Sequence, residues 1–150
     1  MTGTIVQLSC SRGGVPKHAV AEADVTWLGL AGDWQRNRRL HGGPDRALCL
    51  FAIEIIERLQ AEGHPIAPGS TGENVTIRGL DWRALGPGVE LALGDRVRIA
   101  ITQLTTPCKT IKRSFADGKF LRLGPPEASR MYARVLVEGR VRVGDRVVVG

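Results

Sequence analysis

The chain has 150 residues, enough for one domain with a single hydrophobic core. Its 43% hydrophobic and 24% charged residues exclude a disordered chain and predict a folded globular one. The net charge of +6 favours anionic partners: phosphates, an anionic cofactor or nucleic acid. Nucleic acid is the least favoured of these, because the basic residues form no long run and few aromatic residues can stack on bases.

Sequence features also bear on the compartment. The most apolar run, ALCLFAIEII, is interrupted by Glu54 well before the roughly 20 residues that a membrane-spanning helix needs. The N-terminal sequence MTGTIVQLSC lacks the basic and apolar regions of a signal peptide. Three widely spaced cysteines do not form a disulfide framework. We therefore expect free thiols, a cytoplasmic location and no membrane association.

The first half of the chain predicts three strands and one helix. Val25 and Trp27 are expected on one face of the second strand, since side chains alternate along a strand. The helix is predicted at about residues 53–62, where Gly63 can cap its C-terminus and Pro65 prevents continuation. The three strands are predicted at TGTIVQLS (2–9), EADVTWLG (22–29) and ALCLFA (47–52).

The second half predicts strand after strand. Two Gly-Asp pairs, Gly94-Asp95 and Gly144-Asp145, are typical of tight turns between strands. With one principal helix and no linker, the pattern predicts a single domain over residues 1–150, mostly β with a few helices (α+β), as a barrel or strongly curved sheet. The strand segments are ENVTIRG, GVELAL, DRVRIAI, RMYARVLVEG and RVRVGDRVVV.

A glycine-containing basic loop is the first candidate site. The segment GDWQRNRRLHGGPDRA (32–47) places four arginines around the Gly42-Gly43 pair. Arginine forks bind phosphate oxygens in pairs, and glycine N–H groups can complete an anion nest. An exposed basic loop that only improves solubility is the alternative. The arginines are Arg36, Arg38, Arg39 and Arg46.

Cys108, in the segment TQLTTPCKTIKR (102–113), is the second candidate. Basic residues follow it, and neighbouring cations lower the pKa of a thiol and favour the reactive thiolate. Pro107 stiffens the approach and disfavours a helical conformation at the residue before it. Cys10 and Cys49 lie in or beside apolar strands and are expected to be inert, buried thiols.

These pieces together resemble the MOSC domain, the module at the C-terminus of molybdenum cofactor sulfurases, and most closely its small stand-alone bacterial members. The resemblance covers nearly the whole chain. It is carried in order by SRGGVPKHAV, GLAGDWQRNRRLHGGPDRALCLFA, GHPIAPGSTGENVTIRGLDW, TTPCKTI and YARVLVEGRVRVGDRV.

The resemblance implies a MOSC-type β-barrel that binds the molybdenum cofactor, with Cys108 as the molybdenum ligand or as a persulfide carrier. It implies that Lys17 and Arg46 hold phosphate, and that Asn74 and Thr106 contact the pterin or order its loop. Trp34 stands where family members commonly have arginine, so Arg36 or Arg38 would be the anion anchor instead. The site residues carried over by motif are Lys17, His41, Asp45, Arg46, Glu73, Asn74, Thr106, Cys108 and Arg134.

Three functions follow as hypotheses. The first is a molybdenum-cofactor protein that reduces N-hydroxylated small molecules with electrons from a transfer partner. The second is a sulfur carrier that receives sulfur on Cys108 from a cysteine desulfurase. The third is a non-catalytic module that binds anions or nucleic acid, with an affinity that falls steeply with salt.

Overall fold

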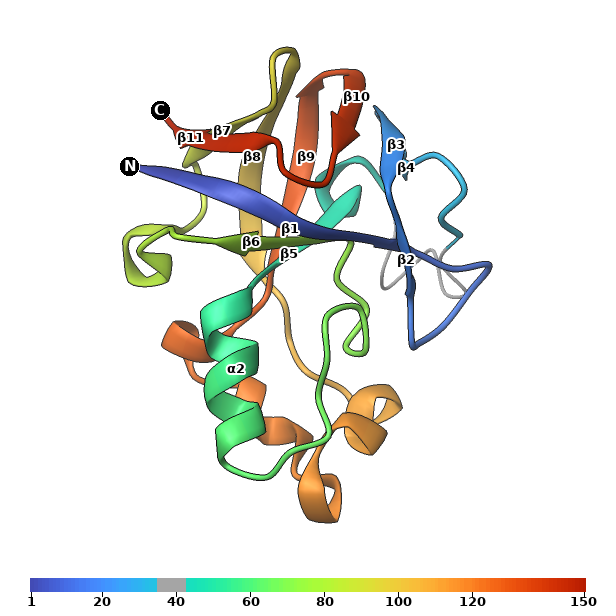
Figure 1. Ribbon diagram of the computed structural model, residues 1–150, viewed down its shortest axis with the longest axis vertical. Coiled ribbons are helices and arrows are strands. Elements are labelled where there is room, and N and C mark those ends of the chain that lie inside the picture. Colours follow the sequence, from blue (N-terminus) through green and yellow to red (C-terminus); the bar gives the residue numbers. More distant parts are fainter. Residues whose placement is uncertain (35–42) are drawn as a thin grey trace.

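The computed structural model describes residues 1–34 and 43–150, and its centre is a closed β-barrel (Figure 1). Seven strands form the ring in the order β11-β7-β8-β9-β5-β6-β1, and β1 pairs with β11 to close it. This confirms the predicted mostly-β fold and barrel. The barrel strands are β1 (Thr2–Cys10), β5 (Leu48–Ala52), β6 (Val75–Arg78), β7 (Glu90–Leu93), β8 (Val97–Leu104), β9 (Met131–Val137) and β11 (Arg146–Val149).

One neighbouring pair in the ring is parallel. β5 and β6 run in the same direction, with Leu50 opposite Val75, and the helix α2 (Ile53–Ala61) lies in the connection between them. All five residues of β5 are buried, which explains why its sequence is continuously apolar rather than alternating. An additional short strand, β2 (His18–Val20), pairs with the far end of β1.

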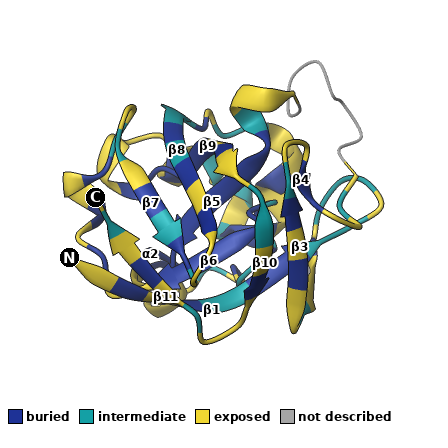
Figure 2. Ribbon diagram, turned by 90° about the horizontal axis from the view of Figure 1, so that it is seen from above, coloured by how far each residue is buried: buried dark blue, intermediate teal, exposed yellow. Residues whose placement is uncertain are grey.

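A smaller sheet packs beside the barrel, with β3 (Glu22–Thr26) between β10 (Gly139–Arg142) and β4 (Gly29–Leu30). Buried and exposed residues alternate along β3, as Figure 2 shows. The expectation that Val25 and Trp27 share a face is wrong: Val25 is 1% exposed and Trp27 is 54% exposed. The strand ends at Thr26, so Trp27 belongs to the turn, where the alternation no longer applies.

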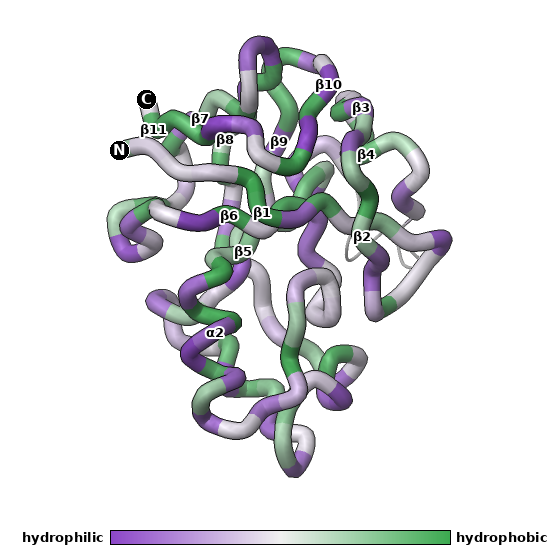
Figure 3. Tube along the Cα trace, in the orientation of Figure 1, coloured by the Kyte–Doolittle hydropathy of each residue, from purple (hydrophilic) through white to green (hydrophobic). Residues whose placement is uncertain are grey.

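The helix α2 begins at residue 53, as predicted, and ends at residue 61, one residue before its predicted end. Apolar residues line the side that packs on the barrel, and polar residues line the other, so green and purple alternate along it in Figure 3. Gly63 adopts a φ of 98° and donates to the Gln60 carbonyl, while the His64 N–H donates to the Leu59 carbonyl. These two hydrogen bonds form a Schellman motif, which satisfies carbonyls at the end of the helix.

Short 3₁₀ helices supply most of the remaining structure. With α2, those between residues 109 and 128 form the lower half of the molecule in Figure 1, below the barrel. No helix within the described ranges is long and apolar enough to cross a bilayer. The 3₁₀ helices are η1 (Pro44–Arg46), η2 (Trp82–Ala84), η3 (Lys109–Ser114), η4 (Ala116–Gly118), η5 (Phe120–Leu123) and η6 (Pro126–Ala128).

Candidate functional site

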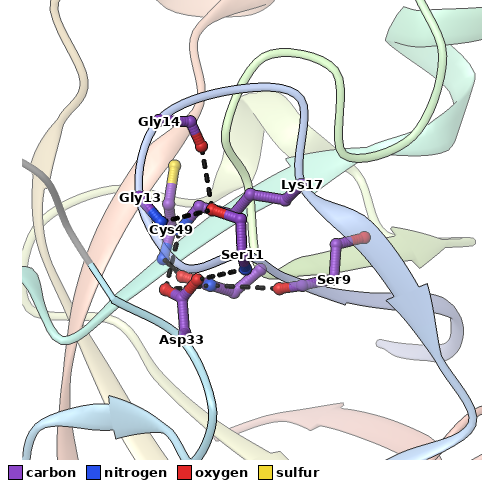
Figure 4. Close-up of polar contacts among 8 residues, drawn as sticks. Ser9, Ser11, Gly13, Gly14, Lys17, Asp33 and Cys49 are labelled. Atoms are coloured by element: carbon purple, nitrogen blue, oxygen red, sulfur yellow. Dashed lines mark hydrogen bonds and ion pairs between the residues drawn. The ribbon is translucent and has the colours of Figure 1, made fainter.

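Asp33 is the hub of a buried polar network beside the end of β1 (Figure 4). One carboxylate oxygen accepts a hydrogen bond from the Ser11 N–H at 2.9 Å. The other accepts from Lys17 Nζ at 2.7 Å and from Asn74 Nδ2 at 2.9 Å. The side chains of Lys17 and Asp33 are only 7% and 3% exposed, so this is a buried ion pair that ties the 11–17 loop to the 31–34 segment.

Lys17 was predicted to hold phosphate, and the structure places it in this network instead. Its backbone N–H also donates to the Gly69 carbonyl, which fixes the loop against the 69–72 turn. At Gly69, with a φ of 86°, a Cβ would lie 2.5 Å from the Lys17 carbonyl oxygen. Only glycine permits this close approach.

Asn74 joins three segments. Its side-chain oxygen accepts from the Cys49 N–H at 3.0 Å, and its amide nitrogen also donates to the Ser9 carbonyl. Its backbone N–H donates to the Cys49 carbonyl, and its carbonyl accepts from the Ser9 N–H. The fully buried Asn74 therefore connects β5 to β1 just before β6 begins, which is an ordering role rather than an exposed contact.

Glu73 and Arg130 form a second buried layer. Glu73 is fully buried and accepts from the Thr71 hydroxyl at 3.2 Å, while Arg130 donates to the Thr71 carbonyl. Burial raises the pKa of Glu73, and the positive charge of Arg130 partly opposes that rise. Within the part of the chain that the structure describes, Glu73 Oε2 and Arg130 Nε are buried without a hydrogen-bond partner.

Cys49 and Tyr132 lie opposite each other in β5 and β9. Burial raises the pKa of the Cys49 thiol, as expected for an inert core cysteine, and Thr105 Oγ1 lies 3.9 Å from its sulfur. Burial raises the pKa of Tyr132 to about 12, and the nearby Cys49 and Cys108 add to the rise, while Arg130 and Arg46 oppose it. The Tyr132 hydroxyl thus senses the charge of both the buried thiol and the loop thiol.

Cys108 is half-buried and directly precedes η3. Its sulfur lies 2.8 Å from the Thr110 hydroxyl, which can donate a hydrogen bond to a thiolate. Its backbone is extended, with φ −133° and ψ 166°, which agrees with a thiol presented from a stiffened loop. Cys10 is also half-buried, but burial and the Asp33 charge raise its pKa and disfavour its thiolate.

Arg46, at the end of η1, stacks over the Tyr132 ring with its guanidinium carbon 5.4 Å from the ring centroid. Stacking uses the face of a guanidinium and leaves its N–H edge able to bind an anion. Asp45 and Arg134 instead form an exposed ion pair with 3.7 Å between Oδ1 and Nε. This pair lies on the surface and is typical of weak solvent-screened bridges.

The structure thus separates the predicted residues into groups. Arg46 and Cys108 both lie close to Tyr132, whereas Lys17 and Asn74 meet in the Asp33 network. Thr106 is exposed, and it is the neighbouring Thr105 that points inward, at 4% exposure. Three predicted residues, Arg36, Arg38 and His41, lie outside the described residues.

Five residues of this region were not predicted as site residues. Alternation along β8 buries Ile99 and Ile101, but a bulge between Ile101 and Gln103 interrupts it before Thr105, so the signal for Thr105 was weak. The others had weaker signals, because single polar residues in loops and strands do not reveal their partners. They are Asp33, Cys49, Arg130 and Tyr132.

A groove of about 350 Å³ lies elsewhere, between α2 and η2. Its polar lining includes Glu54, Arg58 and Arg83, and none of the described residues predicted for the site lines it. Among residues 1–34 and 43–150, no cluster of three or more His, Cys, Asp or Glu side chains is arranged to hold a metal ion.

The closed ring of seven strands, with a half-buried thiol and a stacked arginine near one tyrosine, defines the class of this fold as a small β-barrel domain. The family described as MOSC domain matches residues 37–148, the larger part of the chain. The chain belongs to the MOSC domain family, which is associated with the molybdenum cofactor.

Relatives agree with this assignment. The uncharacterized protein YflK of Bacillus subtilis (strain 168) is 30% identical over 115 residues, covering 75% of this chain and 52% of YflK. Protein YiiM of Escherichia coli (strain K12) is 31% identical over 98 residues, covering 63% of this chain and 43% of YiiM. The chain therefore spans about half the length of these curated relatives.

Solved structures share the fold at lower identity. The YuaD protein from Bacillus subtilis superposes with a TM-score of 0.81 at 19% identity, covering 99% of this chain and 96% of that one. YiiM from Geobacillus stearothermophilus has a TM-score of 0.79 at 22% identity, covering 99% and 75%. These likenesses establish the barrel architecture.

Proposed function

We propose that this chain binds the molybdenum cofactor through Cys108 and reduces N-hydroxylated compounds with electrons from a partner protein. The observation that carries the proposal is the half-buried Cys108 thiol, with the Thr110 hydroxyl 2.8 Å from its sulfur, in a chain of the MOSC family. A soft thiolate is a suitable ligand for molybdenum. The hydroxyl can stabilise that thiolate by donating a hydrogen bond.

The donor set fits the metal end of the cofactor. Cys108 would supply the sulfur ligand, and the free edge of the Arg46 guanidinium would bind an anionic group. Lys17 is paired with the Asp33 carboxylate, so of the two residues predicted to hold phosphate only Arg46 would do so.

The reaction requires two electrons and two protons for each hydroxylamine. The N–O bond breaks, the nitrogen leaves as an amine, and the oxygen leaves as water. The bound cofactor would supply a two-electron redox centre for this chemistry. The chain itself would hold the metal with Cys108 and draw an anionic group to Arg46.

Metal content tests the proposal directly. The protein is purified from cells that make the cofactor, and we expect about one molybdenum per chain, lost in Cys108→Ala. Cys10→Ala is the matched control, because Cys10 is also half-buried but has a raised thiol pKa, and it should retain the metal. Stoichiometric molybdenum in Cys108→Ala would rule out the ligand role.

A sulfur carrier is the second candidate. It is favoured because Lys17 and Asn74, predicted to contact the cofactor, both donate to Asp33 instead, and a sulfur carrier needs no cofactor. A desulfurase persulfide would transfer its outer sulfur to the Cys108 thiol, leaving the desulfurase thiol and a Cys108 persulfide. The test is incubation with a cysteine desulfurase and cysteine, followed by mass spectrometry. One added sulfur on Cys108 is expected, and its absence would argue against this function.

A further inference from the structure

The helix that follows the thiol carries exposed cations on two of its three sides. η3 starts directly after Cys108, and Lys109, Lys112 and Arg113 are exposed within it. A 3₁₀ helix repeats every three residues, so the buried Ile111 marks the row that packs inward. Lys109 and Lys112 share one outward row, and Arg113 lies on the other.

In the described part of the chain these cations form no ion pair, whereas seven other surface arginines do. Among the ion pairs of residues 1–34 and 43–150, none includes Lys109, Lys112 or Arg113. The segment 35–42 contains no Asp or Glu, so it cannot neutralise them either. The arginines with an acidic partner are Arg78, Arg83, Arg98, Arg122, Arg134, Arg140 and Arg142.

An exposed apolar residue adjoins the cations. η5 packs against η3, and its Leu121 is 68% exposed. Lys119 is exposed two residues earlier, and Gly118 lies so close to η3 that a Cβ there would be 3.7 Å from Lys112 Cβ. Lys109, Lys112, Arg113, Lys119 and Leu121 are named here the thiol-side basic patch.

The patch concentrates the charge of the molecule. Its four cations less the one nearby acid, Asp117, give +3, half of the +6 of the whole chain. Protein interfaces combine apolar contacts with a polar rim, and Leu121 supplies an apolar contact beside the charged residues. A stacking platform for bases is missing from the described residues here, since Phe115 is buried and Phe120 is half-buried.

We propose that the thiol-side basic patch docks an acidic surface of a partner protein. This inference rests on the proposed function, since the partner would be the protein that serves Cys108. Docking on η3 would bring that partner to the thiol, because η3 begins at the residue after Cys108. Opposite charges on two such surfaces raise the association rate and make it sensitive to salt.

Binding of poly-L-glutamate to the cofactor-free protein tests the docking surface. We expect salt-sensitive binding that slows the alkylation of Cys108 by iodoacetamide. The triple variant K109E/K112E/R113E should bind at least about tenfold more weakly at low salt and lose this protection. The matched control R58E/R96E/R146E has the same net charge and reverses three exposed arginines elsewhere, so it should retain both.

Three results would overturn the docking proposal. They are failure of the wild-type protein to bind poly-L-glutamate, equal loss in both triple variants, and tighter binding to an oligonucleotide of equal charge. Thermal unfolding of both variants ensures that they are folded before binding is compared. Because the assay uses no cofactor, a wild-type protein that binds poly-L-glutamate but no molybdenum would support the patch and refute the proposed function.

Discussion

Replacing Asp33 by alanine should destabilise the fold strongly. The change leaves the Lys17 ammonium, 7% exposed, without its carboxylate, and it removes an acceptor from the Ser11 N–H and the Asn74 amide. Breaking a buried pair by removing one partner costs about 3–5 kcal/mol, because the remaining charge stays desolvated. At a urea m-value of about 2 kcal/mol/M, the unfolding midpoint should fall by roughly 1.5–2.5 M.

Urea unfolding followed by circular dichroism measures this loss. Lys17→Met in the Asp33→Ala background should recover about 2 kcal/mol, because it removes the uncompensated charge. Arg78→Ala, which breaks the exposed pair with Glu57, is the control and should cost less than about 1 kcal/mol. A loss below about 1 kcal/mol in Asp33→Ala, or no recovery in the double variant, would refute the buried-pair reasoning.

Three further predictions concern the tyrosine, two glycines and two threonines. Tyr132, the only tyrosine, should titrate at about pH 12 in the folded protein by tyrosinate absorbance, and titration near 10 would contradict the assignment. Because its pKa is raised, its contribution to stability is present below about pH 10, and roughly 2–3 kcal/mol at most is lost as the pH rises to 12. Gly69→Ala should lower the free energy of unfolding in urea by at least about 1 kcal/mol more than Gly88→Ala. Both glycines have a positive φ, but of the two only Gly69 has a backbone atom 2.5 Å from the position of a Cβ. Equal losses in the two variants would disprove the clash. Thr105→Ala should lower the free energy of unfolding by about 1–2 kcal/mol and Thr106→Ala by less than about 0.5 kcal/mol, because of the two only Thr105 is buried. A larger loss in Thr106→Ala than in Thr105→Ala would contradict the inward position of Thr105.

Most of the fold could be predicted from local sequence. The strands of the second half, the helix with Gly63 at its end and the Gly-Asp turns depend on alternation, periodicity and turn chemistry, which act over a few residues. The prediction that Trp27 shares a face with Val25 was wrong because the strand ends at Thr26, one residue before Trp27. Closure of β1 on β11 joins residues nearly the whole chain apart, and no local pattern specifies such a pairing.

The site was less predictable, because its polar groups find partners across long sequence distances. Lys17 and Asn74 have the residue types of ligand-binding groups, yet both bind Asp33, 16 and 41 residues away. Cys108 differs, because the features that single it out, the proline before it and the cations after it, are neighbours in sequence. Local chemistry therefore singles out Cys108 as a candidate, whereas the partners in the Asp33 network become visible only in the folded chain.

The seam between β1 and β11 has a mechanical consequence. The strands are antiparallel, with Thr2 opposite Val148, so the first residue of β1 lies beside the end of β11 and the two chain ends are neighbours (Figure 1). A force applied between the two ends would act perpendicular to the strands. It would break their hydrogen bonds one after another, in the unzipping geometry, rather than loading all of them together in shear. The barrel should therefore open at this seam under a low force, although its seven-stranded ring has no free edge at rest.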